Sequence, residues 1–159
     1  MDKLLGAVLR TDLASLVRKV FATVSPGARY CHNWHIDAIV YKLMRVHTGQ
    51  SRRLLINQPP RSLKSICVSI AYMAWVLGHD PTRRVIVVSD SADFGAELHR
   101  QFRMVINSAW YAALFPQVNW AKDTGPVSAN TGHVWTAPRG LARTTHRLVD
   151  RRCDDFDTT

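Results

Sequence analysis

Apolar residues recur at three- and four-residue spacing early in the chain, which predicts two amphipathic helices, at 3–24 and 33–47. Asn33 belongs to the residue types that cap helices. Two further helices, at about 64–77 and 92–107, are expected from the glycine, proline and capping residues around them. A short helical turn is expected near Trp110–Leu114.

Two short apolar runs, Leu54–Ile56 and Val85–Val88, are typical of buried strands. A third strand is expected at His133–Thr136, near a hairpin or a sheet edge. Strands that alternate with helices imply a parallel sheet joined by right-handed crossovers. The pattern therefore predicts an α/β fold.

The segment Gln58-Pro59-Pro60-Arg61-Ser62-Leu63-Lys64-Ser65 lies between the first predicted strand and the third predicted helix. This is the context of a phosphate-binding loop, whose backbone N–H groups surround phosphate oxygens. Lys64 is expected to contact the β- and γ-phosphates of ATP, and the Ser65 hydroxyl to bind Mg²⁺. The alternative is a strand-to-helix turn in which Lys64 faces solvent.

The loop departs from the general pattern GxxxxGK[ST], because Gln58 and Leu63 occupy the two glycine positions. Glycine is preferred there for its freedom to adopt positive φ angles. A leucine therefore requires a modified loop path.

Five segments together resemble the terminase large subunits of tailed phages, the ATPases that package viral DNA. That family often has PPRxGKS in its nucleotide-binding loop, and variants with a large residue before the lysine occur. The other segments resemble the family's adenine-side segment, the helix end after the loop, the second core strand, and a stretch with a WY and an LFP motif. In chain order the five segments are 33–39, 53–65, 74–81, 85–91 and 102–116.

The resemblance implies a P-loop NTPase-like parallel sheet flanked by helices, incomplete here and preceded by a helical segment. We expect an N-terminal helical segment at 1–52, a partial ATPase core at 53–138 and a basic, disordered tail at 139–159. The implied ligands are ATP and Mg²⁺. The implied partners are double-stranded DNA, a small terminase subunit and the portal protein, on which the full-length family assembles as a ring of identical subunits.

The resemblance also implies residue roles. Arg61 takes the place of a candidate cis arginine finger, although a surface arginine or a salt-bridge partner is the alternative. Trp34 and His35 are expected to flank the adenine, and simple helix packing is the alternative. Trp75, Trp110 and Tyr111 are assigned to the core. For Asp90, an N-cap role is favoured over contact with nucleotide.

The family's apolar strand that ends in paired acids has no counterpart in this sequence. Asp154-Asp155 is an acidic pair, but Asp150, Arg151 and Arg152 precede it, and three charges exclude a buried central strand. We therefore assign no catalytic role to Asp154 or Asp155. A truncated or frameshifted gene is the expected explanation, and slow hydrolysis the expected consequence.

Composition and charge leave a second interpretation open. The 159-residue chain is 47% hydrophobic, an ordinary globular value, and carries a net charge of +9. Such a charge favours a polyanionic partner, so a small basic DNA-binding or regulatory protein without nucleotide chemistry is the alternative. A helicase or kinase is less favoured, because the Trp110–Pro116 stretch resembles terminases specifically. Three widely spaced cysteines and the absence of a long apolar run favour the host cytoplasm and no membrane.

Overall fold

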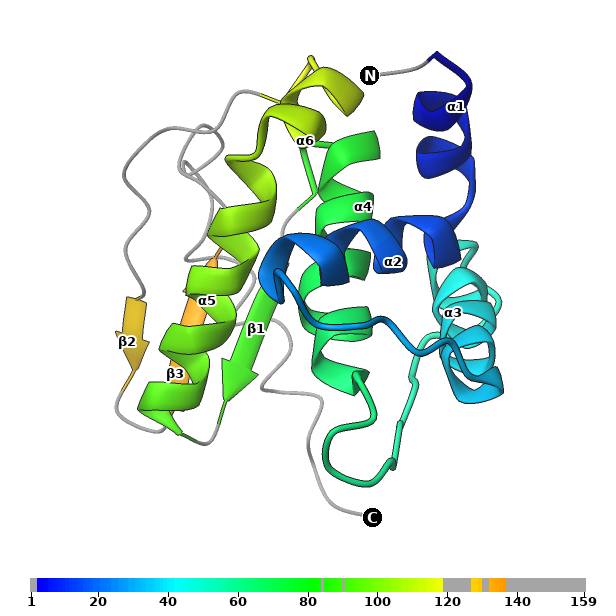
Figure 1. Cartoon of the computed structure of the whole chain (residues 1–159). Helices are drawn as coiled ribbons and strands as arrows, with labels where there is room; N and C mark the ends of the chain where they lie inside the picture. The colour runs from blue at the N-terminus through cyan, green and yellow to red at the C-terminus, as the bar shows by residue number, and fades with distance from the viewer. Residues whose placement is uncertain (1–2, 84, 90, 119–126, 130–131, 137–159) are drawn as a thin grey trace.

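The computed structural model describes residues 3–83, 85–89, 91–118, 127–129 and 132–136, and these are mostly helical (Figure 1). The expected tail at 139–159 and the residues Asp90, Asp154 and Asp155 lie outside this part of the chain. The elements are α1 (Lys3–Thr11), α2 (Leu13–Val24), α3 (Trp34–His47), the π-helical segment η1 (Ile66–Tyr72), α4 (Met73–His79), β1 (Ile86–Ser89), α5 (Ala92–Ile106), α6 (Ala109–Leu114), β2 (Val127–Ala129) and β3 (Gly132–Thr136).

The helix expected at 3–24 is two helices, because Asp12 caps a new one. Its carboxylate accepts hydrogen bonds from the N–H groups of Ala14 at 3.3 Å and Ser15 at 2.8 Å. An aspartate in this position satisfies N–H groups that have no partner within the helix. The chain therefore turns at Asp12, and α2 crosses in front of the long helix that contains α4 (Figure 1).

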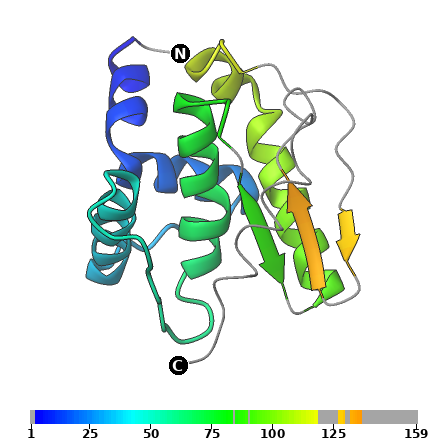
Figure 2. The same ribbon diagram turned by 180° about the vertical axis from the view of Figure 1, so that it is seen from behind.

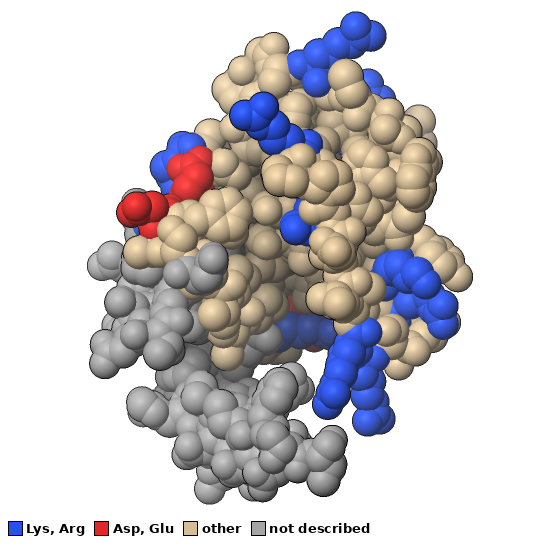
Figure 3. Space-filling view, turned by 90° about the horizontal axis from the view of Figure 1, so that it is seen from below, with Lys and Arg blue, Asp and Glu red and all other residues tan. Residues whose placement is uncertain are grey.

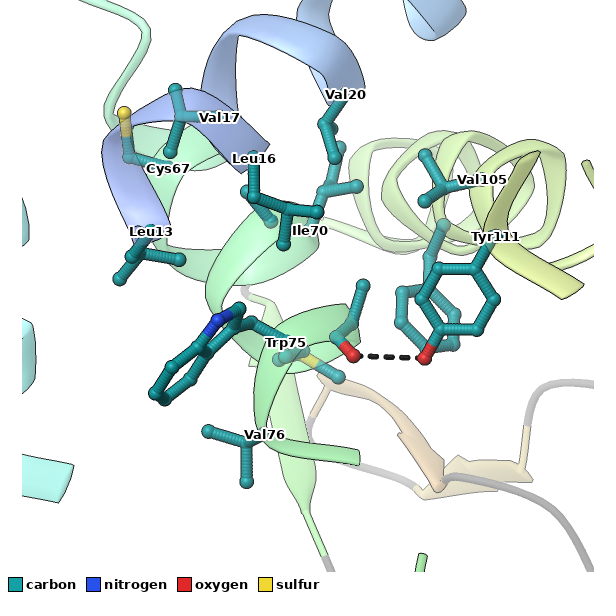
Figure 4. Close-up of a cluster of buried hydrophobic side chains, with 14 of the residues drawn as sticks. Leu13, Leu16, Val17, Val20, Cys67, Ile70, Trp75, Val76, Val105 and Tyr111 are labelled. Carbon is teal, nitrogen blue, oxygen red and sulfur yellow. Dashed lines mark hydrogen bonds between the residues drawn. The ribbon is translucent and has the colours of Figure 1, made fainter. Parts of the chain in front are cut away.

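One hydrophobic core joins the early helices to the later ones. Leu16 of α2, Ile36 of α3, Ile70 of η1 and Val105 of α5 are all fully buried. In Figure 4 the side chains of Leu16, Ile70 and Val105 converge with Tyr111, whose hydroxyl donates to the Ala74 carbonyl oxygen at 2.8 Å. The helical segment before residue 53 thus packs on the same core as the segment after it.

The C-terminal ends of α4 and α6 pack closely against each other. Gly78 has no side chain, and a Cβ placed there would come within 2.6 Å of the Phe115 ring. The Gln117 side chain also donates to the Gly78 carbonyl oxygen at 2.7 Å. Two of the segments that carry the family resemblance, 74–81 and 102–116, therefore pack against each other.

The predicted parallel sheet is wrong. The described strands have the order β1-β3-β2, and both pairs are antiparallel, with Val87 opposite Trp135 and Ser128 opposite His133. The run Leu54–Ile56 is extended but pairs with no described strand, and Leu55 is 93% exposed. A parallel P-loop sheet needs this run as a buried, hydrogen-bonded strand, and the described residues contain no such strand there.

β1 is also less buried than a central strand should be. α5 packs against β1 and β3 on one side, whereas Ile86 and Val88 are 49% and 67% exposed. Viewed from behind, the sheet lies in front of α5, and no described helix is drawn over it (Figure 2). The expectation of a buried strand at Val85–Val88 is therefore wrong, although a strand does form there.

Candidate phosphate-binding loop

The loop at Gln58–Ser65 connects an extended segment to a helix. Residues 53–59 run without regular structure, and helical structure begins at Lys64 and continues through η1 and α4. Figure 1 shows the loop at the lower end of this helix, with the extended segment beside α3. The helix after the loop was expected, whereas the buried strand before it is missing.

Two residues of the loop have left-handed backbone conformations. Arg61 has φ 64° and Leu63 has φ 59°, and among the described residues no other non-glycine residue has a positive φ. This region costs a residue with a side chain about 1–2 kcal/mol. Leu63 thus adopts the conformation for which glycine is preferred, instead of a different loop path. Strain of this kind is concentrated at functional sites.

Hydrogen bonds fix the orientation of two successive peptide groups in the loop. The His35 ring Nε2–H donates to the Ser62 carbonyl oxygen at 3.1 Å, and the Cys67 N–H donates to the Leu63 carbonyl oxygen at 2.9 Å. In a trans peptide the C=O and the following N–H point in opposite directions. The N–H of Leu63 therefore points away from His35, and the N–H of Lys64 points away from the helix.

This backbone is suited to an anion. A left-handed residue followed by a helical one directs successive N–H groups into a concavity that binds anions. The first N–H groups of the helix lack partners within it and carry the positive end of its dipole. The Lys64 and Ser65 side chains are half-buried at the same place, and Arg61 is exposed. The Ser62 hydroxyl oxygen is buried with no hydrogen-bond partner among the described residues.

The first turn of α3 lies against the loop. Trp34 and His35 begin this helix, and the bond from His35 to Ser62 joins positions 27 residues apart in the sequence. Trp34 is 74% exposed, and its ring meets the His35 ring edge to face, with 6.3 Å between centroids. The broad face of this exposed indole, beside the candidate loop, is available to stack on a base.

The stretch of sequence that contains the loop carries charged side chains of one sign only. The sequence has no acidic residue between Asp37 and Asp80. The interval contains six basic residues, none of which forms an ion pair with another described residue: Lys42, Arg45, Arg52, Arg53, Arg61 and Lys64. In Figure 3, Lys and Arg side chains are spread over the face shown, while Asp and Glu gather mostly at one edge.

The aromatic residues assigned to the core occupy it. Trp75 and Tyr111 are buried, and the half-buried Trp110 packs on the core and donates from its indole to the Thr23 hydroxyl at 3.1 Å. The contact between His35 and Ser62 was not foreseen. Sequence spacing gave no signal for it, because it depends on how α3 docks beside the loop.

No protein-family model matches the chain, and comparisons with characterised proteins and with solved structures find no match either. None of the helices in the described ranges has the length and apolar character needed to cross a membrane.

Proposed function

We propose that the chain is the ATP-binding portion of a viral DNA-packaging motor of the terminase large-subunit type. The main observation behind this proposal is the backbone of the loop at the start of a helix. The Leu63 N–H points away from His35, and the Lys64 N–H points away from the helix. The resemblance in five ordered segments supports the motor assignment. The antiparallel sheet lends it no support, so the proposal rests on the loop and its flanking segments.

The side chains of the loop contact different groups of the bound nucleotide. The Lys64 ammonium neutralises the β- and γ-phosphates, and the Ser65 hydroxyl supplies one oxygen to the Mg²⁺ that accompanies ATP. Arg61 is exposed beside them, where its guanidinium can offset charge that develops on the γ-phosphate. Gln58, Pro59 and Pro60 carry the chain into this turn.

Hydrolysis by this chain is expected to be negligible. Attack on the γ-phosphate needs a carboxylate that activates water. In the family that the chain resembles, an apolar strand ending in paired acids supplies this group, and that strand has no counterpart in the sequence. In the assembled motor, as the resemblance implies, the partners are double-stranded DNA, a small terminase subunit and the portal, in the cytoplasm of the host cell.

Titration calorimetry of the full chain with a non-hydrolysable ATP analogue and Mg²⁺ tests the proposal. Lys64→Ala is expected to weaken binding about tenfold or more, because a charge-assisted contact is lost. Lys42→Ala is the matched control, since Lys42 is an exposed lysine of α3 outside the loop, and it should bind like the unaltered chain. Equal affinities of the Lys64→Ala variant and the unaltered chain, or Lys64-dependent ATP turnover, would contradict the proposal as stated.

The six basic residues between Asp37 and Asp80, which form no ion pair with other described residues, support a second candidate, a nucleic-acid-binding protein without nucleotide chemistry. Each phosphate that such residues neutralise releases counterions, so affinity should fall steeply with salt. DNA affinity measured at two salt concentrations, for the unaltered chain and for Lys64→Ala, separates the two. Salt-sensitive DNA binding combined with no Lys64-dependent binding of the ATP analogue would favour this candidate.

A further inference from the structure

We infer that His35 is a positioning residue, which holds the loop in its phosphate-binding conformation and makes no contact with the base. This inference rests on the proposed function and assigns His35 a role different from that of its neighbour Trp34. The two residues begin the same helix, but the His35 ring is half-buried against the loop and the Trp34 ring is largely exposed.

The geometry around Ser62 carries the inference. Ser62 lies between two residues with positive φ, Arg61 and Leu63, so the peptide groups on both of its sides depart from the favoured conformation. The Ser62 carbonyl oxygen accepts a hydrogen bond from His35 Nε2, and among the described residues no backbone N–H donates to it. Among the described residues, the His35 imidazole therefore makes the hydrogen bond that fixes the orientation of the Ser62–Leu63 peptide group.

Rotation of this peptide would turn the Leu63 N–H, the first hydrogen-bond donor of the loop, away from the phosphate. The Leu63 N–H points opposite to the Ser62 C=O, so the hydrogen bond from His35 keeps that N–H pointing away from His35. A donor that is already oriented binds an anion more tightly than one that must first be ordered. His35 therefore acts on phosphate affinity whatever base the ligand carries.

The contact between His35 and Ser62 also requires a hydrogen on Nε2. A carbonyl oxygen only accepts, so Nε2 must carry a hydrogen, which it does in the imidazolium and in one neutral tautomer. A glutamine at position 35 has an amide N–H₂ that reaches a comparable distance from the backbone. His35→Gln should therefore replace the contact, whereas His35→Ala should not.

The test uses two probes with the full chain and Mg²⁺, a non-hydrolysable ATP analogue and inorganic triphosphate. His35→Ala is expected to weaken both about three- to tenfold, the net contribution of one hydrogen bond. His35→Gln should stay within about twofold of the unaltered chain, because its amide N–H₂ replaces the donor. Trp34→Ala should weaken the analogue alone, because triphosphate has no base to stack on.

Matched controls come from the same part of the chain. His32→Ala removes an exposed histidine that pairs with Asp37 and leaves the loop untouched, and Tyr41→Ala removes an exposed aromatic ring of α3. Neither should change the affinity for either probe, and circular dichroism of every variant checks that the fold is kept.

The outcomes separate this inference from the proposed function. If Lys64→Ala binds both probes as the unaltered chain does, the proposed function fails first. If Lys64 matters but His35→Ala weakens the analogue only, His35 contacts the base and the inference is overturned. It is equally overturned if His35→Gln loses as much affinity as His35→Ala, because a replaced donor should suffice.

Discussion

At the scale of single residues, Arg61 and Leu63 hold a backbone conformation that glycine would adopt without steric cost. The two positions are not equivalent. The Leu63 side chain packs against the core, so it gains burial in return for the strain. Arg61 is exposed and has no such compensation among its described contacts. A substitution at Arg61 is therefore better suited than one at Leu63 to measure the cost of the positive φ angle.

Arg61→Gly is expected to raise the free energy of unfolding by about 0.5–1 kcal/mol. The variant relieves the positive φ, and part of this gain is offset by the greater freedom of glycine in the unfolded chain. Urea unfolding followed by circular dichroism measures the change. The same variant should bind the ATP analogue more weakly, because the guanidinium near the phosphates is gone.

Arg53→Gly is the matched control for this change. Arg53 is exposed and has no positive φ, so glycine there brings only the entropic cost and should lower stability slightly. A stability change of the same sign and size at both positions would show that the φ angle of Arg61 carries no strain.

At the scale of elements, the close approach of α4 and α6 depends on Gly78. Its missing Cβ admits the Phe115 ring, which is fully buried, and Phe115 also contacts the His79 ring with 5.2 Å between centroids. Tyr111 adds the hydrogen bond to Ala74, and burial raises the pKa of its hydroxyl well above the ordinary value. The tyrosine therefore stays a neutral donor in this contact.

Gly78→Ala is expected to lower the free energy of unfolding by about 1–3 kcal/mol. Alanine favours a helix over glycine by about 1 kcal/mol, but at this position its methyl group overlaps the Phe115 ring and forces a buried aromatic to move. Thermal or urea unfolding measures the loss. In the double variant with Phe115→Leu the two losses should not add, because the smaller side chain leaves room for the methyl group.

The sequence predicted the helices better than the strands, for a reason visible in two elements. Helix 34–47 follows from the spacing of Ile36, Ile39 and Leu43, all of which are buried. Leu54–Ile56 is apolar enough for a strand, but a strand also needs a hydrogen-bonded neighbour, and apolar runs carry no information about pairing. The candidate site was predictable as a loop before a helix, whereas its contact with His35 required the docking of α3.

At the scale of the whole molecule, helices separated by over 60 residues depend on each other for burial. The Trp75 indole donates to the Arg10 carbonyl oxygen at 3.0 Å, and the Arg10 side chain donates to the Leu114 carbonyl oxygen at 2.8 Å. These two bonds connect α1, α4 and α6 across the core. The loop at Gln58–Ser65 begins the same long helix, so its geometry depends on the packing of the entire helical assembly.

The pH dependence of stability belongs to this scale, because His47 packs between two helices. The His47 ring of α3 packs on Trp75 of α4, with 4.8 Å between centroids. Burial, and then the positive charges of Arg83 and His79, lower the pKa of His47 below its ordinary value. Burial, and then Arg103, likewise lower the pKa of His99 on α5.

Stability is therefore expected to fall as the pH drops below about 6.5, the ordinary histidine pKa. In that range the unfolded chain takes up protons on His47 and His99 before the folded chain does, so acid favours unfolding. Urea midpoints at pH 7.5 and 5.5 measure the effect. The pKa values of Asp12, Asp80 and Glu97 are lowered, so these carboxylates remain ionised at both pH values and do not obscure it.

His47→Gln should reduce the difference between the two midpoints, because glutamine fills similar space and does not titrate. A chain equally stable at both pH values would contradict the prediction, as would an unreduced difference in His47→Gln. The second result would assign the acid sensitivity to His99 of α5, which His99→Gln tests in the same way.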